Sequence, residues 1–267
     1  MTNLHQLLDL VALASGIYAI YSSVEYLLIR ESFGDGGILD WTIVRTSFDD
    51  TPMNRVLRAV LGRFSLVLLA RGVLGASLIL VSLQSGVAKL IVALLVLTDI
   101  CIMFRFPGGL SGASEMSFVV NGSLLIATLF AGNARILHVV LVFVAIQGLL
   151  AYAVAGVAKL AGESWRSGDA VVKIFSTSSW GDDRIFALLR RYPTLKPFGS
   201  WTVMTFEILF PLVLFLDPPY LFAPFAVAVG FHLFNAVFMG INGFLFIFPA
   251  TYPAIFYLNR TIDYSVL

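Results

Sequence analysis

The sequence predicts an all-α fold, a polytopic transmembrane helical bundle with short amphipathic helices at the membrane interface. Its composition is the first reason. Hydrophobic residues make up 59% of the 267 residues and charged residues only 12%, whereas a typical soluble domain is about 45–50% apolar and about 25% charged. A soluble core of this size could not bury so much apolar surface. A bilayer solvates such a surface, so membrane lipid is the first predicted partner.

The spacing of apolar segments is the second reason. A transmembrane helix needs about 20 mainly apolar residues, and eight segments approach this length: 6–29, 59–83, 87–104, 116–132, 136–160, 200–216, 220–240 and 243–258. Only Ile241 and Asn242 separate the last two, which predicts either one broken helix or a tight hairpin. No Lys or Arg precedes the first apolar stretch, so we expect it to be a retained span rather than a cleaved signal peptide.

Two polar segments, 30–58 and 161–198, interrupt the apolar pattern. Their mixture of apolar and charged residues predicts short amphipathic pieces that lie on the membrane surface. With eight spans, both segments fall on the same side, which also holds most of the Arg and Lys residues. The positive-inside rule then places that side in the cytoplasm. No repeat and no long linker divides the chain, so residues 1–267 are expected to form a single domain.

Several classes of function lack support in the sequence. The net charge is +1, and no basic cluster with interleaved aromatic residues indicates a nucleic-acid partner. Cys101 is the only cysteine, so no internal disulfide can form. No second histidine or carboxylate lies near His232 in the sequence, which argues against a metal site.

Ionisable side chains inside a membrane are costly and often functional. Arg71, Asp99 and Glu207 lie within apolar segments. A carboxylate in such a position is protonated or paired, so we expect a structural ion pair that sets the register of neighbouring helices. Arg71 is the expected mate of Glu207, with Asp99 as the competitor.

Lys159, His232 and Asn235 are the candidate catalytic residues. Lys159 ends the fifth apolar segment, where it is either an interfacial lysine that extends toward water or a partly buried lysine that acts as a base. His232 and Asn235 are three residues apart, which puts them on one face of a helix. A helix that continued further would keep Asn242 on that face. Such a face is either a polar seam between helices or part of a site.

Several stretches together resemble one family. YAVAGVAKLAGESWRSGDAV (152–171) resembles the K-L-x-G-x-x-W-x-x-G segment of the HTTM (horizontally transferred transmembrane) proteins, bacterial relatives of vitamin K-dependent γ-carboxylase. GFHLFNAVFMGINGFLFIFPATYPAIFY (230–257) resembles their later His-Asn helix. FEILFPLVLF (206–215) resembles the span between these two, and DGGILDW (35–41) the segment after their first span. The resemblance covers most of the chain, roughly 5–258.

This resemblance implies a multi-pass protein of the cell membrane with lyase chemistry. A lysine base at the position of Lys159 would act on a reduced quinone as cofactor, and His232 and Asn235 would line the same region. The strong base formed from the quinone would remove a carbon proton from a peptide or protein substrate. The catalytic face of the carboxylase is lumenal, whereas the positive-inside rule places the segments next to Lys159 in the cytoplasm.

The sequence also departs from the carboxylase. The carboxylase has a large extramembrane C-terminal part, whereas this sequence stops at Leu267, about ten residues after the last expected span. The carboxylase also has a functional histidine before the span equivalent to 116–132, where this sequence reads SGASEMSFVVNGS and has none. Both departures argue against glutamyl carboxylation itself.

Two further functions therefore stay open. One is a non-catalytic accessory protein for maturation or export of a secreted peptide, in which replacement of Lys159 by Arg or Gln is tolerated. The other is a quinone-linked redox subunit of the DoxX type, which binds a quinone without needing Lys159.

Overall fold

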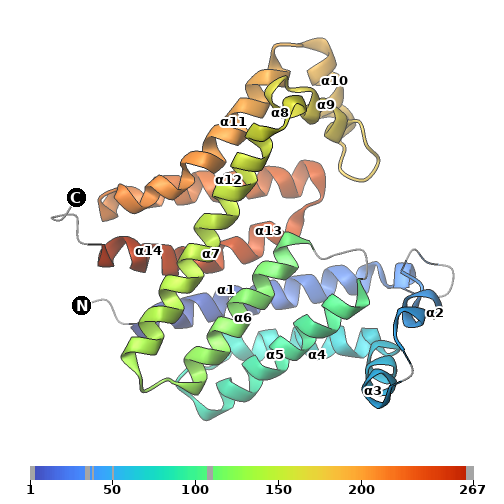
Figure 1. Cartoon of the computed structure of the whole chain (residues 1–267), viewed down its shortest axis with the longest axis vertical. Coiled ribbons are helices and arrows are strands. Elements are labelled where there is room, and N and C mark those ends of the chain that lie inside the picture. The colour runs from blue at the N-terminus through green and yellow to red at the C-terminus, as the bar shows by residue number, and fades with distance from the viewer. Residues whose placement is uncertain (1–3, 34–36, 38, 50, 107–110, 263–267) are drawn as a thin grey trace. The chain divides into compact units, whose positions relative to one another are not determined.

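A computed structural model of the chain describes residues 4–33, 37, 39–49, 51–106 and 111–262, and these residues form helices and no strand (Figure 1). The predicted all-α class is therefore confirmed. The chain divides into two compact units, Met1–Val140 and Leu141–Leu267. The boundary between them falls inside the long helix α7 (Ala134–Ala161).

Six helices of the described chain are long and apolar enough to cross a membrane. They are α1 (Leu4–Leu28), α5 (Gly86–Arg105), α6 (Gly112–Leu129), α7, the segment Leu195–Phe215 formed by α11 and η3, and the segment Pro218–Met239 formed by η4 and α12. Each coincides with one of the expected spans. The chain is thus a multi-pass helical membrane protein.

The other two expected spans are interrupted. In the segment 59–83, α4 (Phe64–Leu80) has only 17 residues. It reaches the length of a membrane span only together with α3 (Pro52–Leu61), from which it is bent by 77°. The segment 243–258 is divided into α13 (Asn242–Ile247), η5 (Phe248–Thr251) and α14 (Tyr252–Thr261). Prolines at 249 and 253 explain these divisions, because proline removes a backbone donor from a helix.

The end of α12 (Phe222–Met239) decides between a broken helix and a hairpin. Gly240 follows α12 with φ of 66°, a left-handed conformation that glycine adopts without strain and that commonly ends helices. The chain then turns back, and α13 packs against α12 (Figure 1). The tight hairpin is therefore the arrangement adopted, and Asn242 begins a new helix instead of extending the face of His232.

The two polar segments form short helices rather than spans. The first contains η1 (Arg30–Phe33), α2 (Trp41–Val44), η2 (Arg45–Ser47) and α3. The second contains α8 (Glu163–Arg166), α9 (Asp169–Phe175) and α10 (Asp183–Arg191). In the motif DGGILDW, residues 35, 36 and 38 lie outside the described part of the chain.

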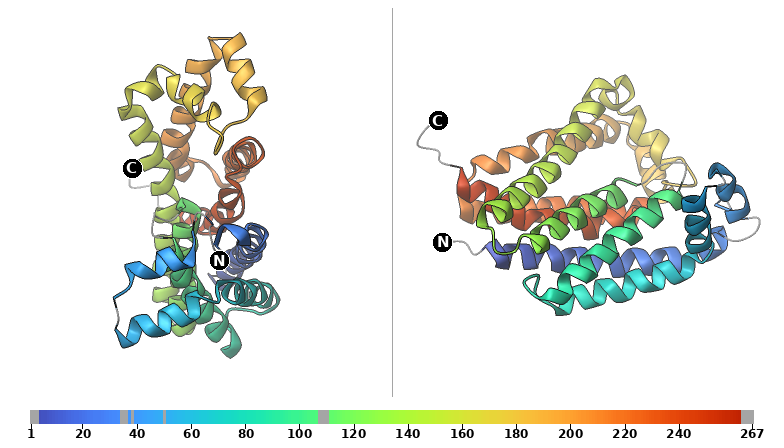
Figure 2. Two further views of the ribbon diagram at one scale, coloured as in Figure 1. Left: turned by 90° about the vertical axis from the view of Figure 1, so that its right-hand side faces the viewer. Right: turned by 60° about the horizontal axis from the view of Figure 1, so that its bottom comes forward.

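In the first unit, α1 and α4 lie side by side (Figure 2). A Cβ atom built on Gly75 would lie 2.7 Å from the carbonyl oxygen of Gly16, and one built on Gly16 would lie 2.7 Å from the carbonyl oxygen of Gly75. Helices in membranes approach closely where both contribute such small residues. The α1–α4 contact therefore depends on a backbone-to-backbone approach.

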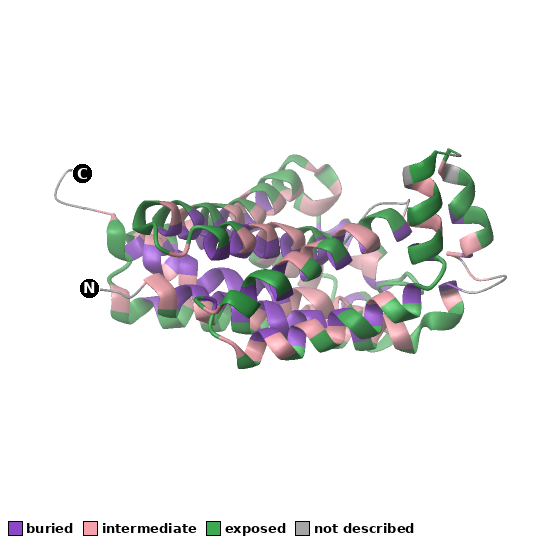
Figure 3. Ribbon diagram, turned by 90° about the horizontal axis from the view of Figure 1, so that it is seen from below, coloured by how far each residue is buried: buried purple, intermediate pink, exposed green. Residues whose placement is uncertain are grey.

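The long helices bury one side and expose the other (Figure 3). On α1, for example, Leu8, Ser15 and Ser22 are buried, and on α4 the apolar side chains of Leu66 and Val73 are exposed. In a bilayer, lipid solvates the exposed apolar sides of the helices. The polar contacts between helices are made on the buried sides.

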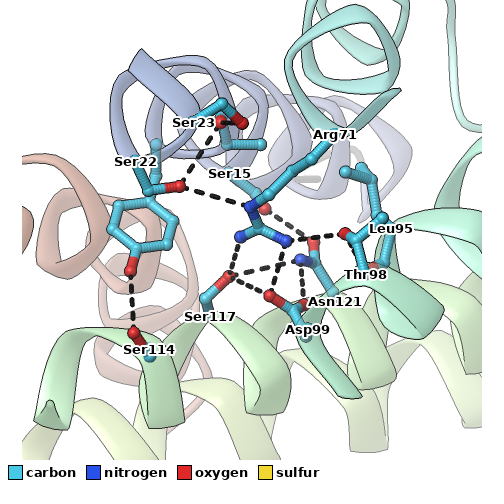
Figure 4. A network of polar contacts seen from close by, with 12 residues as sticks. Ser15, Ser22, Ser23, Arg71, Leu95, Thr98, Asp99, Ser114, Ser117 and Asn121 are labelled. Carbon is cyan, nitrogen blue, oxygen red and sulfur yellow. Dashed lines mark hydrogen bonds and ion pairs between the residues drawn. The ribbon is translucent and has the colours of Figure 1, made fainter. Parts of the chain in front are cut away.

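A polar network joins α1, α4, α5 and α6 within the first unit (Figure 4). At its centre, Nη1 of Arg71 lies 2.7 Å from Oδ1 of Asp99, and the two side chains are only 1% and 3% exposed. The guanidinium of Arg71 also donates hydrogen bonds to the hydroxyl groups of Ser22, Thr98 and Ser117.

The carboxylate of Asp99 is equally well matched. It accepts hydrogen bonds from Ser117 at 3.1 Å and from Nδ2 of Asn121 at 2.7 Å. The amide oxygen of Asn121 in turn accepts one from Ser15 at 2.6 Å (Figure 4). Arg71 is thus paired with the competitor, Asp99, and the expected pairing of Arg71 with Glu207 is wrong, because Glu207 has a partner of its own.

The close approach of α1 and α4 predicts that Gly75→Ala lowers the free energy of unfolding by about 1–3 kcal/mol, because the new methyl group forces the helices apart. Gly122→Ala is the matched control in α6, since a Cβ atom there meets nothing within 4 Å. This control should be neutral or slightly stabilising, because alanine is a better helix former than glycine. Unfolding curves of the full chain in detergent micelles measure the difference, and equal effects at both positions would contradict it.

The ion pair predicts strong non-additivity. Asp99→Leu leaves a buried guanidinium without its counter-charge, which should cost about 3–5 kcal/mol, and Arg71→Met should cost a similar amount. The double variant should lose clearly less than the sum of the two, because no uncompensated charge remains. The same unfolding measurement in micelles tests this, and simple addition of the two losses would mean that the pair contributes no coupling.

Candidate active site

A cavity of about 390 Å³ lies within the second unit, among α7, α9, α11, α12 and α13. Its wall is mainly apolar, and five polar or ionisable side chains interrupt it: Tyr152, Lys159, Glu207, His232 and Asn235. Ligand sites in proteins are commonly cavities of about 300–1,000 Å³ with an apolar lining and a few placed polar groups. The three predicted catalytic residues therefore share one cavity of the expected kind.

Helix α7 carries the first part of the site. Tyr152 and Lys159 are seven residues apart in α7, and both line the cavity, as the helical repeat allows. Gly156 lies between them, and a Cβ atom there would be 2.8 Å from the backbone nitrogen of Ile208 and 3.0 Å from Cβ of Glu207. This glycine lets α7 approach α11 (Leu195–Leu209) closely, which brings Glu207 within reach of Lys159.

Lys159 and Glu207 form an ion pair. The ammonium nitrogen Nζ lies 2.8 Å from Oε1 and 2.7 Å from Oε2 of Glu207, and the two side chains are 22% and 6% exposed. Nζ also lies 5.4 Å from the centre of the Trp165 ring, within the range of a cation–π interaction. Lys159 is therefore a partly buried, paired lysine, and it does not extend freely toward water.

His232, on α12, is more deeply buried than Lys159, because it is only 2% exposed. One of its two ring nitrogens has a hydrogen-bond partner and the other has none among the described residues. Its Nε2 is hydrogen-bonded to the hydroxyl of Tyr152 at 2.7 Å, and that hydroxyl also lies 3.2 Å from the hydroxyl of Tyr252. Its Nδ1 has no hydrogen-bond partner among the residues that the structure describes. Buried polar atoms usually have a partner, so Nδ1 is an unsatisfied atom of a residue that lines the cavity.

The contacts of His232 allow two tautomers, because either the Tyr152 hydroxyl or Nε2 can be the donor in the hydrogen bond between them. When Tyr152 donates its hydroxyl proton to Nε2, the imidazole carries its own proton on Nδ1. The unpartnered nitrogen is then a hydrogen-bond donor inside an apolar cavity. Such a donor would bind a carbonyl or phenolate oxygen of a ligand.

Aromatic rings form part of the remaining wall. Phe244 and Phe248 are stacked at 5.3 Å with an angle of 15° between their planes, and the ring centre of Phe248 lies 4.8 Å from that of His232. Phe231 and Trp165 also line the cavity. Flat apolar surfaces of this kind suit a planar ring as ligand.

Asn235 completes the predicted set. It lies one helical turn after His232 in α12, is partly buried and lines the same cavity. The helix thus presents an imidazole and an amide to one space. The amide supplies both a donor and an acceptor to a bound polar group.

Sequence reasoning missed part of this site. The sequence predicts Glu207 as one half of a structural ion pair with Arg71, and it gives Tyr152 and Trp165 no role in the site. Two signals in the sequence pointed to them: Tyr152 precedes Lys159 by seven residues, and Trp165 belongs to the lysine motif itself. No comparable signal connects Glu207 with Lys159, because their contact arises only when α11 packs on α7.

Comparison of the chain with protein-family models, with curated proteins and with solved structures found no match. The resemblance to the HTTM proteins therefore rests on the motifs in the sequence alone.

The Lys159–Glu207 pair predicts that Glu207→Gln lowers the free energy of unfolding by about 1–3 kcal/mol, because a charge-assisted hydrogen bond is lost and Lys159 keeps its charge. The loss should be smaller than for Asp99→Leu, since Lys159 is 22% exposed. Glu163→Gln, an exposed carboxylate in the same unit, is the control and should be neutral. Thermal unfolding in micelles checks this, and equal stability of both variants would argue against the pair.

Proposed function

We propose that this chain is a quinone-dependent membrane enzyme of the HTTM type, similar to the membrane core of vitamin K-dependent γ-carboxylase. Lys159 is its base, and His232 and Asn235 position the bound ring. The observation that supports this proposal best is the convergence of these three side chains on one apolar cavity. A lyase of this class acts on a peptide or protein substrate.

The residues of the cavity fit a reduced quinone. Phe244 and Phe248 offer stacked faces for a planar ring, and Nδ1 of His232, which has no partner among the described residues, is a donor for one of its oxygen atoms in the tautomer that carries the proton on Nδ1. When bound, a reduced quinone would supply an oxidisable ring whose reaction with molecular oxygen yields a base strong enough to take a proton from carbon. Such chemistry requires a site from which water is largely excluded.

Glu207 gives Lys159 a route to the neutral amine. In the ion pair, Nζ of Lys159 holds three protons and can accept none. Transfer of one proton from Nζ to a Glu207 oxygen, across 2.7 Å, converts the pair into an amine and a carboxylic acid. An apolar environment favours such neutral forms over separated charges. The amine can then take a proton from a hydroxyl group of the ligand, and Glu207 retains the first proton.

We also propose that the chain crosses the cell membrane eight times. The bent pair α3–α4 and the returning arm α13–α14 would add two crossings to the six long apolar helices. Both polar segments then lie on one side, and their basic residues favour the cytoplasmic side.

Lys159→Arg tests the base directly. Arginine keeps the positive charge beside Glu207 but does not release a proton in proteins. We expect binding of a short-chain naphthoquinone, followed through the quenching of tryptophan fluorescence, to be retained, while oxidation of the corresponding quinol slows about 100-fold or more. Lys173→Arg, an exposed lysine of α9, is the control and should keep both properties.

The outcomes separate the alternatives. Full activity of Lys159→Arg, both in the quinol assay and in cells that depend on the gene, would exclude the catalytic role. Retained activity of this variant together with loss of quinone binding in His232→Ala would favour a redox subunit of the DoxX type.

The ion pair itself favours a second candidate function, a non-catalytic accessory protein for maturation or export of a secreted peptide. Lys159 and Glu207 would then only hold α7 against α11. In that case Lys159→Arg preserves function in cells, and no quinone quenches the tryptophan fluorescence of the chain.

A further inference from the structure

Arg105 is the last residue of α5, and it is 1% exposed within the first unit. Its guanidinium donates one hydrogen bond, from Nη2 to the carbonyl oxygen of Phe33 at 2.9 Å. Nε and Nη1 are buried and have no hydrogen-bond partner among the residues that the structure describes. Buried guanidinium groups without partners are costly, so these two nitrogens indicate a missing acceptor.

Three aromatic rings surround this guanidinium. Its Cζ lies 5.2 Å from the ring centre of Trp41, 5.3 Å from that of Phe33 and 5.6 Å from that of Phe64. These rings stabilise the positive charge through cation–π interactions, and they hold the planar group in one orientation. They do not replace the hydrogen-bond acceptors that Nε and Nη1 lack.

One carboxylate interacts electrostatically with Arg105, that of Asp40. Its Oδ1 accepts hydrogen bonds at 2.7 Å from the backbone nitrogen and from the hydroxyl of Thr42. Asp40 thereby caps α2. Its charge offsets part of that of Arg105 without supplying an acceptor to Nε or Nη1.

A separate cavity of about 150 Å³ opens at Arg105. Arg30 and Ser65, both exposed, line it together with the aromatic rings. The cavity is far larger than the space that one water molecule needs. It therefore combines two cationic side chains and a hydroxyl group around a space that fits a small anionic group.

The position of Arg105 indicates which anion is within reach. Helix α5 has 20 residues, the length that spans the apolar core of a bilayer, and Arg105 ends it. The end of a span lies at the level of the lipid headgroups, where phosphate groups are concentrated. Guanidinium groups donate charge-assisted hydrogen bonds to phosphate oxygens, and Nε and Nη1 of Arg105 are donors that lack an acceptor among the described residues.

We propose that Arg105 and Arg30 form a binding site for a phosphate group at the membrane interface. The phosphate comes either from the headgroup of an anionic lipid or from free phosphate. The site is separate from the cavity of Lys159 and does not depend on the function proposed for it.

The test uses the full chain in a neutral detergent and measures the rise in melting temperature on titration with three probes. These are phosphatidylglycerol, phosphatidylcholine and inorganic phosphate. We expect the wild type to be stabilised by phosphatidylglycerol more than by phosphatidylcholine. Arg30→Gln and Ser65→Glu alter exposed positions of the cavity, so they should fold and bind the stabilising probe about tenfold or more weakly.

Two more variants complete the design. Arg63→Gln removes an exposed charge next to the cavity but not in its lining, and it should respond like the wild type. Arg105→Lys keeps the charge but loses the several donors of the guanidinium group, and it should lose the response. Stabilisation by inorganic phosphate, sensitive to the same variants, would assign the site to free phosphate. The proposal is overturned when no phosphate probe stabilises the wild type, or when Arg30→Gln and Ser65→Glu respond like Arg63→Gln.

Discussion

A charge that is buried in an apolar helical bundle must be matched within the bundle, because neither lipid nor water is there to solvate it. Among the residues that the structure describes, two buried or partly buried ion pairs meet this requirement, one in each unit of the chain, and each joins neighbouring helices. Arg71 with Asp99 ties α4 to α5 and, through their hydroxyl and amide partners, to α1 and α6. Lys159 with Glu207 ties α7 to α11.

The two pairs differ in how completely their surroundings satisfy them. Around Arg71 and Asp99, both charged groups have several hydrogen-bond partners, and none of their atoms is among the unpaired buried ones. Such closed networks specify a packing arrangement. Lys159 borders a cavity and is partly exposed, and the neighbouring His232 retains a free Nδ1. An open, partly satisfied set of this kind suits a site that completes its contacts with a ligand.

Glycines allow a close approach of two helix backbones beside each pair. Between α7 and α11 the charged side chains themselves meet across this approach, whereas between α1 and α4 it is Ser22 that meets Arg71. Gly16 and Gly75 join α1 to α4, which carries Arg71, and Gly156 joins α7 to α11, which carries Glu207. Larger residues at these positions would move the helices apart. Because charge pairing weakens with distance, the close approach of α7 to α11 and the ion pair of Lys159 with Glu207 depend on each other.

The sequence by itself determined the membrane class, the helical fold and six of the spans, because length and apolar composition are local properties of a segment. It also singled out Lys159, His232 and Asn235, since ionisable and amide groups stand out in apolar runs. Only the tertiary structure decided the partners. Glu207 lies 48 residues after Lys159, and Asp99, rather than Glu207, lies against Arg71. Which carboxylate meets which cation depends on which helices pack together, and no local pattern in the sequence encodes that.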